Sequence, residues 1–113
     1  MAVNHERLQS ACFLWFWNTY PEHRYLMHAN INSHPRFRVR DLTVLKGVGL
    51  VKGVFDLEFY FYGVLYIFDI KTGADSLSFW QKEFLHAIES HGGKGFEIRE
   101  LDEFKRIIKE IIE

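Results

Sequence analysis

A chain of 113 residues is long enough for one hydrophobic core and too short to divide into two, so we expect residues 1–113 to form a single domain. Hydrophobic residues make up 48% of the chain and aromatic residues 17%, which excludes a disordered protein. The net charge of −1 gives no overall attraction to nucleic acid, so a phosphate-binding surface would have to come from an uneven distribution of charge.

The compartment and the assembly also follow from composition. Cys12 is the only cysteine, so an internal disulfide is excluded and a reducing compartment is favoured. No apolar run approaches the roughly 20 residues of a membrane span, and we expect a soluble, cytoplasmic protein without a membrane partner. Eleven Phe, five Tyr and three Trp exceed what so small a core can bury, which suggests a partner surface, most simply a homodimer.

The N-terminal half begins with apolar residues at helical spacing. They predict an amphipathic helix over residues 5–18 that ends before Pro21, with Asn4 as its N-cap. The elements expected next are a short strand at 25–28, a polar loop at 30–35 and a helical turn within 36–46.

Two β-prone runs follow, Val54–Phe61 and Val64–Lys71. Tyr62-Gly63 separates them, and the glycine supplies the positive φ that a tight turn needs. The pattern predicts a β-hairpin closed about this dipeptide.

The C-terminal third contains two more helices and a strand. Ser78 is expected to cap a helix over 79–91 that stops at Gly92-Gly93, with Trp80, Phe84, Ala87 and Ile88 as its buried stripe. A strand is expected over 95–99, and a closing helix over 102–112 buries Phe104, Ile107, Ile108 and Ile111. The order of elements predicts an α+β or α/β sandwich with one mixed sheet.

The hairpin brings charged residues together. Closure about Tyr62-Gly63 places Asp56 opposite Asp69, and Lys71 projects from the same face two residues later. Like charges opposed across two strands destabilise them, and a hard divalent cation would compensate, because carboxylate and water oxygens are the ligands that Mg²⁺ selects. The alternative is a structural Asp69–Lys71 ion pair with Asp56 at the sheet end, and spacing alone favours neither.

The ordered motifs resemble a family, the VRR-NUC branch of the PD-(D/E)XK nucleases. The resemblance rests on a glycine-rich run leading into Asp56, the Asp69-Ile70-Lys71 motif, a serine-to-glutamine helix start and a double glycine. The segments are 45–57, 68–73, 77–82 and 92–93, with Glu6 and Gln9 in the first helix. The resemblance implies a restriction endonuclease-like core, with a central mixed sheet flanked by helices in the order αβββαβ and an extra C-terminal helix.

The resemblance also implies roles for residues. Asp56, Asp69 and the backbone carbonyl of Ile70 would hold Mg²⁺ or Mn²⁺, and Glu6 would contact the ion directly or through water. Lys71 would polarise the attacking water and neutralise the phosphate, and Gln81 would position water or phosphate. Two residues depart from the family pattern: Phe55 stands where proline is usual, and Asp69 is one methylene shorter than the commoner glutamate.

Basic residues between positions 36 and 52 are the candidate DNA-binding surface. Asp41 is the only acidic residue in that stretch. The basic residues are Arg36, Arg38, Arg40, Lys46 and Lys52. The resemblance adds Asn30 or Asn32 on a substrate-side loop. A solvated basic arm is the plainer alternative. Gly47, Gly49 and Gly53 do not form a phosphate-binding loop, and we expect them to let DNA approach the backbone closely.

Six histidines raise the alternatives of a zinc site or an HNH nuclease, particularly around His28 and His34. The chain has no cysteine pair and no helical histidine pair, so both readings are weaker than the carboxylate site.

The function predicted from these observations is metal-dependent endonucleolytic cleavage of DNA by a homodimer. The stand-alone, phage-borne members of the resembled family, which are similar to Holliday junction resolvases, suggest branched, flap or four-way junction DNA. Nicking or sequence-specific cleavage is the nearest rival. Two further alternatives are a nuclease-like domain that binds nucleic acid or protein without cutting, and a purely structural domain.

Overall fold

The computed structural model describes residues 2–30, 44, 46–49 and 51–113. The expectations for Asn32, Arg36, Arg38, Arg40 and His34, and most of the helical turn expected within 36–46, lie outside the described residues.

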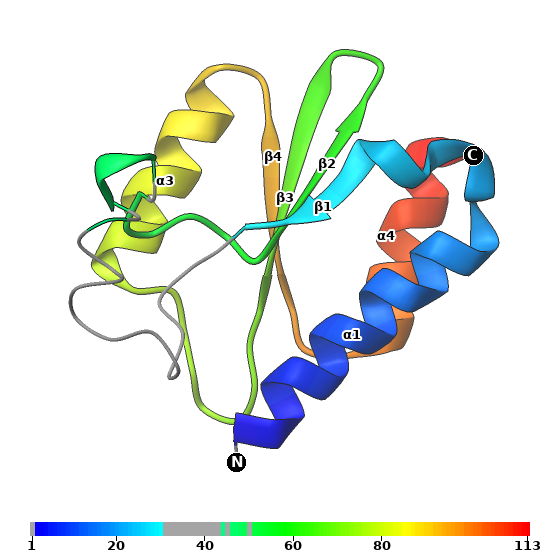
Figure 1. The fold of residues 1–113 in the computed structure, drawn as a ribbon, viewed down its shortest axis with the longest axis horizontal. Coiled ribbons are helices and arrows are strands. Elements are labelled where there is room, and N and C mark those ends of the chain that lie inside the picture. The colour runs from blue at the N-terminus through cyan, green and yellow to red at the C-terminus, as the bar shows by residue number, and fades with distance from the viewer. Residues whose placement is uncertain (1, 31–43, 45, 50) are drawn as a thin grey trace.

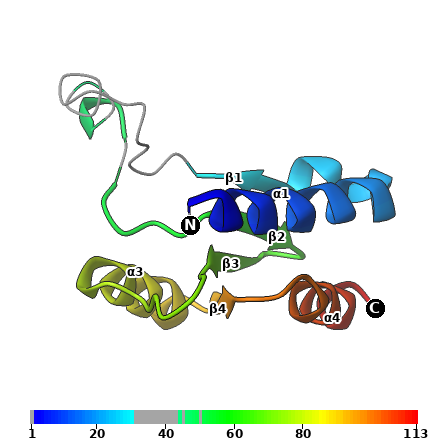
Figure 2. The ribbon, with the colours of Figure 1, turned by 90° about the horizontal axis from the view of Figure 1, so that it is seen from below.

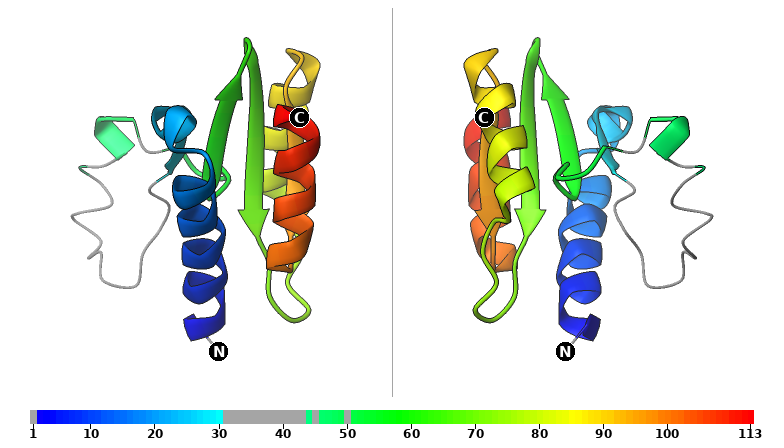
Figure 3. Two further views of the ribbon diagram at one scale, coloured as in Figure 1. Left: turned by 90° about the vertical axis from the view of Figure 1, so that its right-hand side faces the viewer. Right: turned by 90° about the vertical axis from the view of Figure 1, so that its left-hand side faces the viewer.

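A mixed four-stranded sheet forms the centre of the molecule, in the order β1-β2-β3-β4. Neighbouring strands are antiparallel from β1 to β3, and β3 and β4 are parallel. Helices α1 and α4 lie side by side over one face of the sheet, and α3 covers the other (Figures 1 and 3). The strands are β1 (Met27–Ala29), β2 (Leu57–Phe61), β3 (Val64–Ile70) and β4 (Lys94–Ile98), and the helices are α1 (Ala2–Thr19), α3 (Phe79–Ser90) and α4 (Leu101–Ile112).

The predicted N-terminal helix is confirmed, although α1 begins at Ala2. Asn4 therefore lies inside the first turn, and its prediction as N-cap is wrong. Cys12 and Phe16 lie one turn apart and are completely buried. A 3-10 helix (Pro21–Leu26) takes up part of the segment expected as a strand, so β1 begins only at Met27.

The hairpin has the predicted register, with Phe61 opposite Val64 and Leu57 opposite Phe68. Tyr62 and Gly63 both have positive φ, 48° and 80°, as a two-residue turn of the type I′ class requires. The first strand is shorter than predicted, because side chains take over the hydrogen bonding before Leu57. Ile70 N–H donates to the carboxylate of Asp56 instead of continuing the strand ladder.

Helix α3 has the predicted start, but the face that it turns toward the sheet is only half-buried and differs in part from the predicted stripe. Ser78 and Gln81 form a reciprocal capping box. Phe84 packs against Phe55 with ring centroids 5.7 Å apart, and Leu85 lies so close to β4 that a Cβ at Gly95 would overlap it. This rotation toward β4 leaves Trp80 and Ala87 exposed, so the predicted stripe is wrong at those two positions.

The main core lies between the sheet and the pair formed by α1 and α4 (Figure 2). Helix α4 presents the predicted stripe, with Phe104, Ile107 and Ile108 buried and Ile111 half-buried. The ring of Phe104 meets that of Phe68 edge-on at 5.1 Å. Burial of such side chains contributes about 1.5–3 kcal/mol each, which makes this face the principal source of stability.

None of the helices in the described part of the chain has the length and apolar character that crossing a bilayer requires.

Candidate active site

A cleft of about 600 Å³ lies at the end of the sheet where β2 begins and β3 ends. It is lined by Asp56, Asp69 and Lys71, together with His5 from α1 and Gln81 from α3. The cleft therefore collects polar side chains from both helical layers around the end of the central strand. The structure brings together at this cleft the predicted catalytic and metal-binding residues Asp56, Asp69, Ile70, Lys71 and Gln81 and the predicted DNA-binding residues Lys46 and Lys52.

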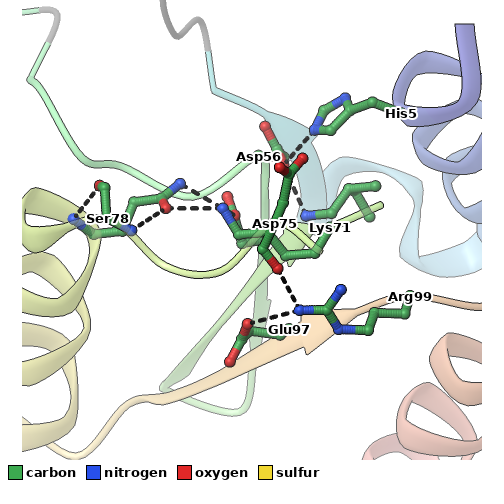
Figure 4. A network of polar contacts seen from close by, with 10 residues as sticks. His5, Asp56, Lys71, Asp75, Ser78, Glu97 and Arg99 are labelled. Carbon is green, nitrogen blue, oxygen red and sulfur yellow. Dashed lines mark hydrogen bonds and ion pairs between the residues drawn. The ribbon is translucent and has the colours of Figure 1, made fainter. Parts of the chain in front are cut away.

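Asp56 lies one residue before β2 and is fixed by three segments of the chain. Its Oδ2 accepts a hydrogen bond from Ile70 N at 2.8 Å and lies 3.2 Å from Nε2 of His5 (Figure 4). Its backbone carbonyl accepts from Asn30 N at 3.0 Å. The side chain is only 13% exposed, so its orientation toward the cleft is set by the fold.

Asp69 is the most deeply buried charged residue of the described chain, at 1% exposure. Its Oδ2 lies 2.8 Å from Nζ of Lys71 and accepts a hydrogen bond from Nε2 of Gln81 at 3.1 Å. Its Oδ1 is buried and has no hydrogen-bond partner among the described residues. A buried oxygen that lacks a partner costs about 1–3 kcal/mol, so this atom marks a place where a ligand would be stabilising.

The pKa of Asp69 is raised from 3.8 to about 6. Burial is the largest cause, because it disfavours the charged form, and the negative charge of Asp56 is the second. The hydrogen bond and positive charge of Lys71 act in the opposite direction. A hydrogen bond to the Asp56 carboxyl, open only to protonated Asp69, adds to the rise. The negative charge of Asp56 and the burial of the site thus both make it unfavourable for Asp69 to be ionised.

Lys71 follows β3 directly and is 9% exposed. Its backbone N–H donates to the carbonyl of Ile98 at 2.9 Å, which extends the pairing with β4 by one residue. The side chain consequently points to the same side as Asp69, and Nζ also donates to Oε1 of Gln81 at 2.9 Å. The ammonium group is held at the cleft by one carboxylate and one amide.

Gln81 links the start of α3 to the centre. Its backbone N–H donates to Oγ of Ser78 at 3.1 Å, and its Oε1 accepts from Ser78 N at 3.0 Å. The same side chain contacts Lys71 and Asp69. The capping box that begins the helix therefore also fixes the amide between the two charged groups.

The first helix contributes His5 to this site, a residue that the sequence did not single out. Glu6, its neighbour, was predicted to approach the ion, and it is exposed on α1. His5 is one of six histidines, and nothing in its local sequence distinguishes it, because its contact depends on how α1 crosses the sheet.

Arg99 holds the loop that follows Lys71. Its Nη1 donates to the carbonyl of Gly73 at 3.1 Å, and its Nη2 donates to the carbonyl of Asp75 and lies 3.6 Å from Glu97 (Figure 4). Asp75 lines the cleft. A guanidinium fixed by two carbonyls and a carboxylate thus sets the shape of one side of the site.

The predicted DNA-binding residues within the described chain have different positions. Lys46 and Lys52 are exposed and line the cleft. Asn30 is half-buried, and its Nδ2 donates to the carbonyl of Phe55 at 2.9 Å, so its amide supports the segment before Asp56. Gly53 packs against the backbone of Trp80, where a Cβ would overlap, so packing against α3 by itself requires a glycine at this position.

The donor set fits a hard divalent cation. Asp56 and Asp69 present carboxylates to one cleft, and Oδ1 of Asp69 lacks a partner there among the described residues. Within the same part of the chain, no three His, Cys, Asp or Glu side chains form a metal-binding group on their own. A Mg²⁺ ion suits such a site, because it is held by one or two carboxylates and keeps several waters.

Comparison with known proteins agrees with this architecture. No protein-family model matches the chain, and no curated protein matches it. Among solved structures, a chain described as "VRR_NUC domain protein" superposes with a TM-score of 0.73 at 16% sequence identity, over 96% of this chain and 87% of that one. The chain therefore has the fold of a VRR-NUC domain, and the predicted PD-(D/E)XK-like architecture is confirmed.

Proposed function

We propose that this chain is a metal-dependent phosphodiesterase that hydrolyses DNA. The observation that carries the proposal is the buried Oδ1 of Asp69, which has no hydrogen-bond partner among the described residues and lies in the cleft that Asp56 and Lys71 also line. A buried oxygen without a hydrogen-bond partner is destabilising, so an ion pair with a purely structural role would not account for it. The nuclease-like fold of the superposed structure supports the same function.

Each group of the centre has a role in such a reaction. Asp56 and Asp69, with the carbonyl of Ile70 and water, would hold Mg²⁺ or Mn²⁺, and Glu6 would act through water from α1. The bound ion would supply a Lewis acid to the phosphoryl oxygen. Lys71 neutralises charge on the phosphate and orients water, because its ammonium is held at the cleft. Gln81 positions Lys71 through its Oε1.

DNA is the proposed substrate because cations line the cleft beside the carboxylates. Lys46 and Lys52 are exposed there and can neutralise phosphates on either side of the cut. The predicted contributions of Asn32, Arg36, Arg38 and Arg40 belong to the same proposal. Branched, flap or four-way junction DNA is the proposed structural preference.

A cleavage assay tests the proposal. Labelled single-stranded, duplex, flap and four-way junction DNA are incubated with Mg²⁺, Mn²⁺ or EDTA. We expect cleavage that requires the metal and is lost in Asp69→Asn and Lys71→Ala. Lys109→Ala, which removes an exposed lysine of α4, is the control and should cut normally. Circular dichroism confirms that each variant is folded.

The same assay separates the alternatives. Binding of DNA without cleavage in any metal would favour a nuclease-like binding domain. Neither binding nor cleavage would favour a structural domain, in which Asp69 and Lys71 serve only as an ion pair. A Lys71→Ala variant that cuts at the normal rate would contradict the role given to this lysine.

We also propose that the chain works as a homodimer. Large apolar side chains are exposed away from the cleft, among them Leu14 at 51%, Tyr25 at 99% and Tyr62 at 92%. Contact with a second copy would remove such side chains from water. Sedimentation velocity over a range of concentrations gives the oligomeric state directly, and a monomer at all concentrations would contradict the proposal.

A further inference from the structure

Two aromatic side chains begin α3 beside the active site and remain exposed. Phe79 is 65% exposed and Trp80 is 48% exposed, and their rings meet edge-on with centroids 5.2 Å apart. Apolar surface of this size at a helix start is unfavourable in water, so a ligand that covers it gains free energy.

The position of Trp80 is fixed relative to the catalytic centre. Its backbone packs against Gly53, which leaves no room for a Cβ there. The next residue, Gln81, lines the cleft and contacts both Lys71 and Asp69, so the first turn of α3 forms one edge of the site. A group that rests on Trp80 would lie at this edge.

A cation completes this surface. Nζ of Lys52 lies 5.4 Å from the centroid of the Trp80 ring, and Lys52 also lines the cleft. The exposed aromatic surface offers a place for a base to stack, and the ammonium group over the Trp80 ring can reach the phosphate of the same nucleotide.

We propose that Phe79, Trp80 and Lys52 form a subsite that stacks an unpaired nucleobase next to the phosphodiester to be cut. The inference rests on the proposed function and narrows its substrate to DNA that has an unpaired nucleotide at the cleavage position, as in a flap or a single strand. A fully paired duplex keeps its bases stacked on one another and cannot use the subsite.

Binding is measured in EDTA, so that cleavage does not interfere. Fluorescence anisotropy follows labelled single-stranded, flap and blunt duplex DNA. We expect Trp80→Ala to weaken binding of the first two by about tenfold, the size of one base–aromatic stack, and binding of the duplex by less than about twofold. Trp80→Phe should restore most of the affinity.

Trp17→Ala is the matched control. Trp17 is 38% exposed and carries Arg24 over its ring at 4.7 Å, so it has the same chemistry as Trp80. It belongs to the C-terminal part of α1, which lies at the opposite end of the molecule from α3 (Figures 1 and 2). This variant should bind all three DNAs like the parent protein.

An abasic scan locates the base. Removal of a single base at one position of the unpaired strand should reproduce the tenfold loss in the parent protein and cause no further loss in Trp80→Ala, as a coupled pair requires. Equal loss on paired and unpaired DNA, insensitivity to abasic sites, or no binding of DNA by the parent protein would overturn the inference. A Trp80→Ala variant that changes the oligomeric state would also overturn it and assign the surface to protein contact.

The two proposals fail in different ways. Metal-dependent cleavage of all DNAs that Trp80→Ala leaves unchanged would retain the phosphodiesterase and remove the subsite. Selective loss of unpaired-DNA binding in Trp80→Ala, without cleavage by the parent protein in any metal, would retain the subsite and remove the activity.

Discussion

Nε2 of His5 lies 3.2 Å from Oδ2 of Asp56, so the first helix touches the acid that precedes β2. Ile70 N–H occupies the same carboxylate oxygen at 2.8 Å. The two groups are far apart in sequence, one in α1 and the other in β3, and together they restrict the rotation of Asp56. His5 is therefore a positioning residue for a carboxylate that is proposed to hold the metal ion.

His5→Ala should weaken Mn²⁺ binding by about tenfold, the lower end of the usual effect of groups that orient metal ligands. The protein should stay folded, because the lost hydrogen bond is partly exposed and worth about 1 kcal/mol or less. Isothermal titration calorimetry measures the affinity, and His5→Gln, which can still donate, should recover part of it. His86→Ala, an exposed histidine of α3, is the control. Unchanged Mn²⁺ affinity in His5→Ala would refute the positioning role.

Arg99→Ala should loosen the loop between Lys71 and α3, because it removes the donors to the carbonyls of Gly73 and Asp75. We expect faster amide hydrogen exchange at residues 72–77 and a several-fold lower cleavage rate. Arg106→Ala is matched to it, since Arg106 is an exposed arginine with one ion pair to Glu110 at 3.2 Å. Amide exchange rates at residues 72–77 that rise equally in both variants would show that the hydrogen bonds of Arg99 do not order this loop.

The hairpin explains why so much of the site was predictable from sequence. Tyr62-Gly63 defines the turn, the turn defines the register, and the register brings Asp56 toward Asp69. Lys71 follows from the alternation of side chains along a strand. The turn, the register and the alternation of side chains all depend on residues close together in the sequence, so they can be predicted from the sequence alone.

Other features depend on how distant elements pack, and local sequence does not contain them. The contact of His5 depends on the path of α1 across the sheet. The exposure of Trp80 depends on the rotation of α3 toward β4, where Gly95 admits Leu85. The first hairpin strand starts late, at Leu57, because Asp56 and Asn30 use their side chains to bond the backbone of Ile70 and Phe55. Periodicity gave no sign of these competing partners.

Gly53→Ala should lower the free energy of unfolding by about 2 kcal/mol or more, because φ is +96° and a Cβ would overlap the carbonyl of Trp80. Gly49→Ala separates the two causes: its φ is +117°, and no heavy atom of the described chain lies within 4 Å of the added Cβ. That variant should lose only about 1 kcal/mol from backbone strain. Urea denaturation measures both, and equal losses would show that the contact with Trp80 adds nothing.

The raised pKa of Asp69 makes stability depend on pH. The folded state favours the neutral form of Asp69, so protonation of this acid stabilises the fold. This contribution to the free energy of unfolding is fully present below pH 3.8, the pKa of the acid in the unfolded chain, and is lost as the pH rises through about 6. A rise of the Asp69 pKa from 3.8 to about 6 corresponds to about 3 kcal/mol, so the free energy of unfolding of the metal-free protein should fall by up to that amount between pH 4 and 7. In Asp69→Asn this part of the pH dependence should be absent.

Mg²⁺ should reverse the loss, because the ion binds the deprotonated carboxylate and only in the folded state. We therefore expect saturating Mg²⁺ to raise the melting temperature clearly at pH 7.5 and little at pH 4.5, with no rise in Asp69→Asn at either pH. Thermal melts with Mg²⁺ or EDTA across this range provide the measurement, and Na₂SO₄ at equal ionic strength controls for general salt effects. A rise in melting temperature that is the same at both pH values would mean that Mg²⁺ acts elsewhere, and that the buried acid is not its ligand.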